Sequence, residues 1–249
     1  MKTHHVRLVG VLAITLALRT AAAQQCPGDL NCDQHVTIDE IVTAVNAALN
    51  ECPAGTSCNG RFPASGQTTS YGPGSDGAVR AGAPLSYTDN GDGTITDNNT
   101  GLMWEKKDSS AGVHDQDNSY TWGMTESNTM DGTMVTEFLD TLNRAPCFAG
   151  HCDWRIPNVK ELLSIVDYEI PYPGPAVDAA FNTNCVAGCT VDGTGGPMCS
   201  CTASDSYWSS TTVRTRPSNA WDVFLGSGDV AGSDKRLIRR AARAVRGGL

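Results

Sequence analysis

The sequence has little of the machinery on which most enzymes depend. It contains five histidines in 249 residues, and it has no Gly-x-Ser-x-Gly elbow, no His-Glu-x-x-His helix and no phosphate-binding loop. No cysteine follows Cys201, so a reactive cysteine pair near the C-terminus is absent as well. Carboxylates are abundant, but their spacing does not single out two of them as a glycosidase pair. These absences favour a binding or structural protein over an enzyme.

Basic residues are also scarce. The chain has 18 Lys and Arg against 27 Asp and Glu, so its formal net charge is −9. An acidic surface of this kind argues against nucleic acid as a partner. Six basic residues nevertheless gather within the last fifteen positions and form a candidate anion-binding cluster: Lys235, Arg236, Arg239, Arg240, Arg243 and Arg246. The alternative interpretation is a solvated strand or tail that balances the acidic body.

Long apolar runs are missing except for one, from Leu8 to Leu18, which lies between a basic start and Ala21-Ala22-Ala23. The run is too short to cross a bilayer, so we interpret residues 1–23 as a secretory signal peptide cleaved near Ala23. No later segment is apolar enough to span a membrane. Cleavage would remove three basic residues and no acidic one, which moves the formal charge from −9 to −12. We therefore expect a secreted protein, extracellular or at the cell surface.

Ten cysteines follow the apolar run, at positions 26, 32, 52, 58, 147, 152, 185, 189, 199 and 201. In an oxidising compartment, an even number of cysteines favours a disulfide framework. Cys147 and Cys152 would close the least costly loop. The four cysteines at 185, 189, 199 and 201 could instead hold zinc through their thiolates, which is the less favoured interpretation for an exported chain.

Composition divides the mature chain into three parts. Residues 24–58 form a cysteine-bounded unit that is too short to bury much core, so cross-links or a metal should hold it. Residues 59–84 are rich in Gly, Ser, Thr and Pro, which predicts a linker and the start of the next domain. Residues 85–249 are long enough for one domain with a sizeable core.

The large domain has signals for both strands and helices. Turn dipeptides alternate with short apolar stretches over 87–106, which predicts hairpins. Apolar residues at helical spacing predict helices at 133–143 and 158–168, and the second has Asn158 as a natural N-cap with Glu161 three residues on. The best strand candidates are 206–212, 220–228 and 242–248. This order favours an antiparallel α+β domain with cross-linked loops over a doubly wound sheet.

The stretch from Asp29 to Glu40 has the spacing of an EF-hand calcium loop. Such a loop binds the ion from positions 1, 3, 5, 7, 9 and 12, and the last ligand is a bidentate carboxylate. These positions are here Asp29, Asn31, Asp33, His35, Thr37 and Glu40. His35 would bind through its backbone carbonyl, and Thr37 directly or through water. We therefore predict calcium as the cofactor of the N-terminal unit.

A helix should follow this loop, because Thr37 and Glu40 form a capping box and an apolar stripe continues to Leu49. Position 6 of the loop is Gln34 instead of the usual Gly, and a left-handed non-Gly residue costs about 1 kcal/mol, which would weaken the site. The unit resembles one EF-hand of a dockerin type I module, which would imply a cohesin partner, although only one copy is present. The alternative is that the acidic residues merely solvate a surface loop.

Several motifs occur in order in the rest of the chain: "DNGDGTITDNNTGLMWEK", "TEFLDTLN", "DWRIPNVKELLSIVDY", "YWSSTT", "AWDVFLGSG" and "RAVRGG". Together they resemble the Lcl C-terminal domain family, named for a collagen-like bacterial adhesin, over about residues 62–249. The resemblance implies a C-type-lectin-like α+β fold and, since the adhesin member binds sulfated glycans, a glycan ligand. Many members have a Cys where this chain has Ala244, which implies that the terminal strand is not cross-linked here.

Other candidate residues carry weaker signals. Trp208 and Trp221 could stack on a sugar ring, although such residues are more typical of the core of a small sheet. Arg155 is more typical of a structural ion pair with Asp153 or Glu161 than of a ligand contact. The domain lacks key ligands of a calcium-dependent lectin site, so we do not expect it to bind sugar through calcium.

We predict a secreted, non-enzymatic binding protein with a calcium-stabilised, EF-hand-like module and a lectin-like domain that binds a glycan or a sulfated surface polymer. The candidate ligand-binding residues are Lys235, Arg236, Arg239, Arg240, Trp208 and Trp221. The alternative is a dockerin-bearing enzyme or accessory protein of polysaccharide degradation. A structural surface protein that meets protein partners is a third possibility.

Overall fold

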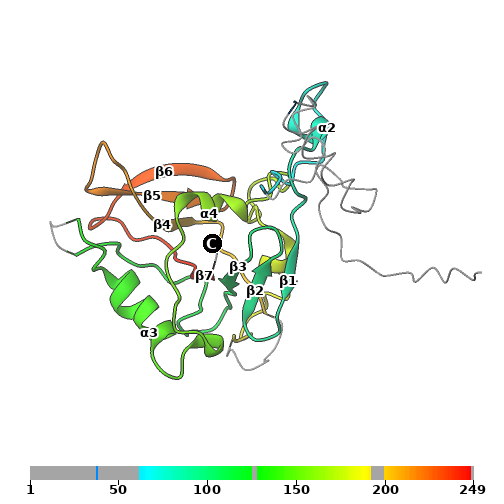
Figure 1. Cartoon of the computed structure of the whole chain (residues 1–249). Helices are drawn as coiled ribbons and strands as arrows, with labels where there is room; N and C mark the ends of the chain where they lie inside the picture. Colours follow the sequence, from blue (N-terminus) through cyan, green and yellow to red (C-terminus); the bar gives the residue numbers. More distant parts are fainter. Residues whose placement is uncertain (1–37, 39–61, 125–127, 192–198, 248–249) are drawn as a thin grey trace, which may run out of the picture. The chain divides into compact units, whose positions relative to one another are not determined.

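The computed structural model describes residue 38 and residues 62–124, 128–191 and 199–247. The chain divides into two compact units, Met1–Ser57 and Cys58–Leu249, and all described residues except Ile38 belong to the second, which Figure 1 shows in colour. The signal peptide, the other residues of the predicted calcium loop and the four cysteines up to position 58 lie outside the described residues. Those predictions stay predictions.

A four-stranded antiparallel sheet forms one half of the domain. Its order is β1-β2-β3-β7, with β1 at Tyr87–Asp89, β2 at Thr94–Asp97, β3 at Leu102–Glu105 and β7 at Val245–Gly247. The turn between β1 and β2 is closed by the Asp92 carboxylate, which accepts hydrogen bonds from the backbone N–H and the hydroxyl of Thr94. The predicted hairpins are therefore confirmed, and the C-terminal strand pairs with β3 although about 140 residues separate them in sequence.

A three-stranded antiparallel sheet forms the other half, in the order β4-β5-β6. β4 (Ser206–Thr212) and β5 (Asn219–Phe224) lie where the sequence predicts strands. β6 (Asp229–Asp234) is not among the predicted strands, because all its residues except Val230 are small or acidic and four of its six are exposed. It is an edge strand, and pairing with β5 along its whole length fixes its extended shape.

The two predicted helices are present but short. The first is a π-helix at Met134–Leu139 (η1) that continues as α3 (Asp140–Asn143), and the second is α4 (Val159–Ser164). α4 has the expected capping box, since Asn158 accepts from backbone N–H groups of the first turn and Glu161 accepts from the backbone N–H of Asn158. Three further one-turn helices are α2 at Asp76–Val79, η2 at Phe148–Gly150 and η3 at Ala179–Phe181. Within the described ranges, no helix is long and apolar enough to cross a membrane.

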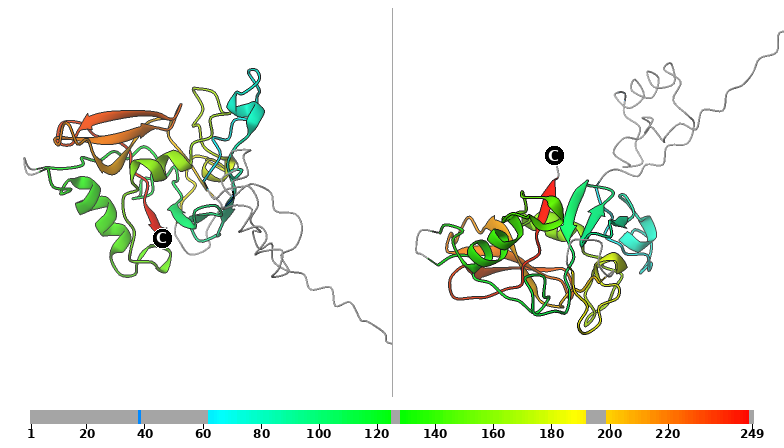
Figure 2. Two further views of the ribbon diagram at one scale, coloured as in Figure 1. Left: turned by 45° about the horizontal axis from the view of Figure 1, so that its top comes forward. Right: turned by 90° about the horizontal axis from the view of Figure 1, so that it is seen from below.

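Two clusters of buried apolar side chains form the core. One centres on Trp104 of β3 and Tyr207 of β4 and includes the buried face of α4, and the other centres on Trp208 and Phe138. Neighbouring residues of β4 therefore contribute to different clusters, as expected when side chains alternate across a strand. In both views of Figure 2, the red strand β7 lies beside the green strands of the four-stranded sheet. The domain is thus a mixed α+β fold, mostly β with few helices.

Among the described residues, three disulfides cross-link the loops of this domain. Cys147 pairs with Cys152, as expected from the short loop between them. The four thiols that could have held zinc form two disulfides instead, Cys185–Cys201 and Cys189–Cys199. The sequence left both interpretations open, and the disulfide framework is the one that holds for these residues. All three disulfides lie upstream of the terminal strand, in agreement with Ala244 at the Cys position of the family.

The segment at 62–86 forms the edge of the same domain. A parallel bridge joins Pro63 to Ala83, and the carboxylate of Glu169 accepts hydrogen bonds from the backbone N–H groups of Thr68 (2.7 Å) and Thr69 (2.9 Å). A hydrogen bond from the Thr69 hydroxyl, followed by these bonds from the backbone N–H groups of Thr69 and Thr68, lowers the pKa of Glu169 to about 2. The loop that follows α4 is thus joined by hydrogen bonds to a segment that lies about 100 residues earlier in the sequence.

Candidate anion-binding pocket

A polar pocket lies at one end of the three-stranded sheet. Its volume is about 460 Å³, and its lining includes Lys235 and Arg236 from the end of β6 and Pro217 and Ser218 from the β4–β5 loop. Gly123, Asn128 and Thr129 complete the described lining. The loop and the strand end meet because the Lys235 backbone N–H donates to the Ser218 carbonyl at 2.9 Å.

The turn after β6 places successive basic residues differently. The Asp234 carboxylate accepts hydrogen bonds from the backbone N–H groups of Arg236 (2.9 Å) and Leu237 (3.0 Å), which tightens the turn. These bonds, that of Arg236 first, hold the pKa of Asp234 below its usual value. As a result, Lys235 is buried against the domain while Arg236 is exposed.

Lys235 is a buried cation at the base of the pocket. Its ammonium donates to the Thr212 hydroxyl at 2.8 Å and lies 3.9 Å from the centre of the Trp122 ring. Burial lowers the pKa of Lys235, because removal from water disfavours the charged form. The cation–π contact and the hydroxyl partly replace the lost water. The lysine therefore contributes positive potential to the pocket while its stem stays in place.

Two further arginines belong to the β4–β5 loop, whose Pro217 and Ser218 line the pocket, but neither arginine is part of the described lining. Arg214 and Arg216 are exposed, and among the described residues neither forms an ion pair with a carboxylate. A hydrogen bond of 2.9 Å from the Arg216 backbone N–H to the Val213 carbonyl shapes this loop. Neither arginine is among the residues that the sequence singles out, since both lie about 20 positions before the C-terminal cluster. No local signal could have found them, because only the pairing of β5 with β6 brings the loop to Lys235.

The other basic residues of the predicted cluster are spread over the domain instead of meeting at one site. Arg239 donates to the Ser119 backbone carbonyl, and Arg240 lies 3.6 Å from the buried carboxylate of Asp222. Arg246 pairs with Asp153. The prediction of one continuous C-terminal cluster is therefore corrected, since pairing in the fold turns successive residues in different directions.

The two predicted tryptophans also differ in position. Trp208 is fully buried, and its ring N–H donates to the Tyr120 carbonyl at 2.8 Å, so no face of the ring is open to a sugar. This corrects its assignment as a ligand residue, and the core interpretation holds. Trp221 is half-buried and pairs with Gly232 of the edge strand β6, so part of its ring stays accessible.

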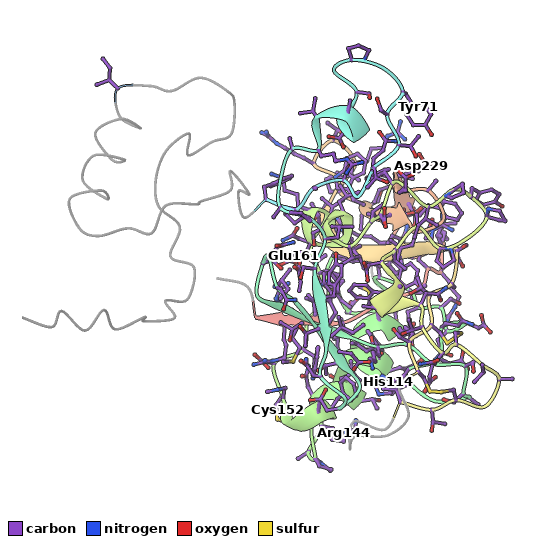
Figure 3. The ribbon with its side chains drawn as sticks, turned by 90° about the vertical axis from the view of Figure 1, so that its right-hand side faces the viewer. Tyr71, His114, Arg144, Cys152, Glu161 and Asp229 are labelled. Atoms are coloured by element: carbon purple, nitrogen blue, oxygen red, sulfur yellow. A yellow bond between two sulfur atoms is a disulfide. The ribbon has the colours of Figure 1, made fainter. Side chains whose placement is uncertain are left out.

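A buried charge network links β3 to the C-terminal segment. One oxygen of the Glu105 carboxylate lies 2.7 Å from His114 Nδ1 and 3.1 Å from Lys107 Nζ, and the other accepts from the Ala244 backbone N–H at 2.9 Å. Arg243 is fully buried and donates to the Glu105 carbonyl at 2.9 Å. Figure 3 labels His114 at the end of the domain that lies away from Asp229. These residues form hydrogen bonds and ion pairs with one another inside the domain, so we assign them a structural role.

Charge in this network is balanced by close pairing. Burial by itself raises the pKa of Glu105, but the charge of Lys107 and the hydrogen bonds from His114 and Ala244 outweigh it and hold that pKa below its usual value. Burial lowers the pKa of Lys107 and of Arg243. The carboxylate therefore stays ionised between two buried cations.

Arg155 has the structural role that the sequence favours. Its guanidinium donates to both oxygens of the Glu161 carboxylate, at 2.9 and 2.7 Å. This bidentate pair links the strand-like segment before α4 to the first turn of the helix. The hydrogen bond to Glu161 raises the pKa of Arg155.

A disulfide-linked, mostly β domain with a polar, basic pocket is typical of an extracellular binding protein. Residues 93–246 match the Lcl C-terminal domain family, and the chain belongs to this family. The family is one of adhesin-like, non-enzymatic domains. No curated protein matches the chain. The match begins within the β1–β2 turn, so the structure adds β1 and residues 62–86 to the same folded unit.

Proposed function

We propose that the large domain binds an anionic surface polymer, such as a sulfated glycan, at the pocket beside Lys235. The observation that carries this proposal is the polar pocket lined by Lys235 and Arg236 and by Pro217 and Ser218 of the β4–β5 loop, the loop that also bears the exposed Arg214 and Arg216. Arginine suits sulfate and carboxylate groups, because its planar guanidinium can donate two parallel hydrogen bonds. Trp221, which is half-buried on the neighbouring strand, could contact a sugar ring of the same polymer.

The net negative charge of the protein opposes the binding of an anionic polymer. The whole chain carries a formal charge of −9, so attraction must come from the local basic surface. At 0.1 M ionic strength, salt screens interactions between charges more than about 10 Å apart. It therefore weakens the repulsion between the polymer and distant acidic residues, and it also weakens the attraction of the exposed basic residues. Binding should therefore be weak at high salt and independent of calcium.

The proposal includes two finer assignments that rest on sequence patterns. The large domain would have a C-type-lectin-like fold, supported by its mixed α+β structure, its disulfides and its antiparallel sheets. The N-terminal module would bind calcium through Asp29, Asn31, Asp33, His35, Thr37 and Glu40, and this ion would stabilise the module without taking part in ligand binding. Secretion would bring both modules to the cell surface.

The test is a glycan array of the mature protein that includes sulfated polymers, run with calcium and again with chelator. We expect binding to sulfated polymers in both conditions and a roughly tenfold or greater loss for Arg214→Ser/Arg216→Ser, since each hydrogen bond to a charged group contributes about 1.5–3 kcal/mol. The matched control is Arg144→Ser/Lys160→Ser, which removes two exposed charges elsewhere. Equal losses in both double variants would mean that net charge, and not this pocket, determines binding.

A further inference from the structure

Aromatic side chains gather at the other end of the three-stranded sheet, beside the β5–β6 turn. Tyr168 and Tyr172 belong to the loop after α4, and their side chains are 44 % and 68 % exposed. Phe224, the last residue of β5, is half-buried, and its ring centre lies 6.2 Å from that of Tyr172. We call Tyr168, Tyr172 and Phe224 the tyrosine platform.

The fold holds Tyr168 of this platform in a fixed position. Its backbone N–H donates to the Ser65 carbonyl at 2.9 Å, and its hydroxyl lies 3.4 Å from the Gly228 carbonyl. Gly228 has a φ of 81°, and a Cβ at this position would lie only 2.7 Å from the tyrosine ring. A larger residue at this position would be strained in its backbone and would push the tyrosine ring aside. A ring held in this way loses little side-chain freedom when it binds a ligand.

The border of the platform is polar and acidic. Asp229 is exposed, and its carboxylate accepts a hydrogen bond of 2.7 Å from the Ser227 hydroxyl. Partial burial, and then the nearby charge of Asp229, raise the pKa of Tyr168, so this carboxylate lies near the ring. Figure 3 labels Asp229 at the same end of the domain as Tyr71. A ligand at this surface would meet apolar ring faces beside hydrogen-bond acceptors of negative charge.

We propose that the tyrosine platform binds the pyranose rings of an uncharged polysaccharide. The C–H face of a pyranose is apolar and can stack on an aromatic ring, while its hydroxyl groups donate to carboxylates such as that of Asp229. A sulfated or carboxylated polymer would be repelled by this carboxylate. A stable protein partner needs about 800 Å² on each side, far more than three partly exposed rings supply.

This site is separate from the proposed anion-binding pocket. The pocket lies beside the β4–β5 loop and the platform beside the β5–β6 turn, so the six residues of β5 separate them by about 20 Å. The inference does not depend on the pocket, and each site can fail without the other.

The experiment is affinity electrophoresis of the mature protein in native gels that contain an uncharged β-glucan, xylan, mannan or galactan. We expect at least one polymer to retard the protein. Tyr172→Ala should weaken that retardation about tenfold, because an aromatic contact contributes about 1 kcal/mol beyond the area it buries. Tyr172→Phe keeps the ring and should stay within about twofold of the parent protein.

Two controls separate the platform from other surfaces. Leu237→Ala truncates another exposed apolar side chain, close to the pocket, and Arg214→Ser/Arg216→Ser alters the loop beside the pocket. Neither should change the retardation. The proposal is overturned if none of the four polymers retards the protein, or if Tyr172→Ala migrates like the parent. Capture of a proline-rich peptide that depends on Tyr172, without polysaccharide retardation, would assign the platform to protein partners instead.

Discussion

Glu105 offers the sharpest test of how this domain is held together. Glu105→Gln keeps the shape of the side chain but removes the charge that faces Lys107 and Arg243, both of which are buried. Removing one partner of a buried ion pair costs about 3–5 kcal/mol, because the remaining charge is left without compensation. The total stability of a domain is about 5–15 kcal/mol, so this variant should lose a large part of it.

The assay is thermal unfolding at neutral pH, followed by circular dichroism with the disulfides intact. A domain of this size changes its Tm by about 2–4 °C per kcal/mol, so the expected decrease is roughly 6–20 °C. Asp153→Asn is the matched control, since it also neutralises one carboxylate, but on an exposed pair with Arg246 that contributes below about 1 kcal/mol. A Tm for Glu105→Gln within the range of this control would refute the argument that the network is structural.

Two further predictions concern other parts of the chain. The pKa of Glu169 is lowered from 4.5 to about 2. The hydrogen bonds that its carboxylate accepts from Thr68 and Thr69 should therefore be fully formed above pH 4.5 and lost as the pH falls toward 2. Hydrogen exchange of the two amides, corrected for its intrinsic pH dependence, should show this loss of protection, and Glu169→Gln should show none of it. Chelation of calcium should loosen the N-terminal module and leave the Tm of the large domain unchanged, as measured by differential scanning calorimetry. A large-domain transition that shifts with chelator would contradict the division of roles between the modules.

Local signals in the sequence determined the elements that close within a few residues. α4 was predicted from Asn158, Glu161 and its apolar spacing, and the structure has the same cap. The β1–β2 hairpin followed from its turn dipeptides, and β4 occupies the predicted residues. β6 escaped prediction, because its small, exposed residues carry no alternation and only pairing with β5 makes it a strand.

Only some residues of the candidate site could be predicted from the sequence. The basic cluster in the sequence includes Lys235 and Arg236, and both line a pocket in the structure. Trp208 was named as a possible ligand residue and is a core residue instead. Arg214 and Arg216 are not among the sequence candidates, because sheet pairing and not sequence proximity brings their loop beside Lys235. Burial and long-range pairing depend on which faces of the strands meet, and a single sequence does not specify this.

Local turns, the cap of α4 and the approximate positions of the two longer helical segments could be predicted from the chain alone, because they depend on residues close together in sequence. The ordered motifs likewise indicated the family. An oxidising compartment remains a prediction from the sequence, consistent with the disulfides. Which charges are buried, as in Glu105 and Arg243, and which reach solvent, as in Arg214, became known from the folded domain. The physical reason is that the cost of burying a charge depends on partners far away in the chain, and these partners meet only when the two sheets form.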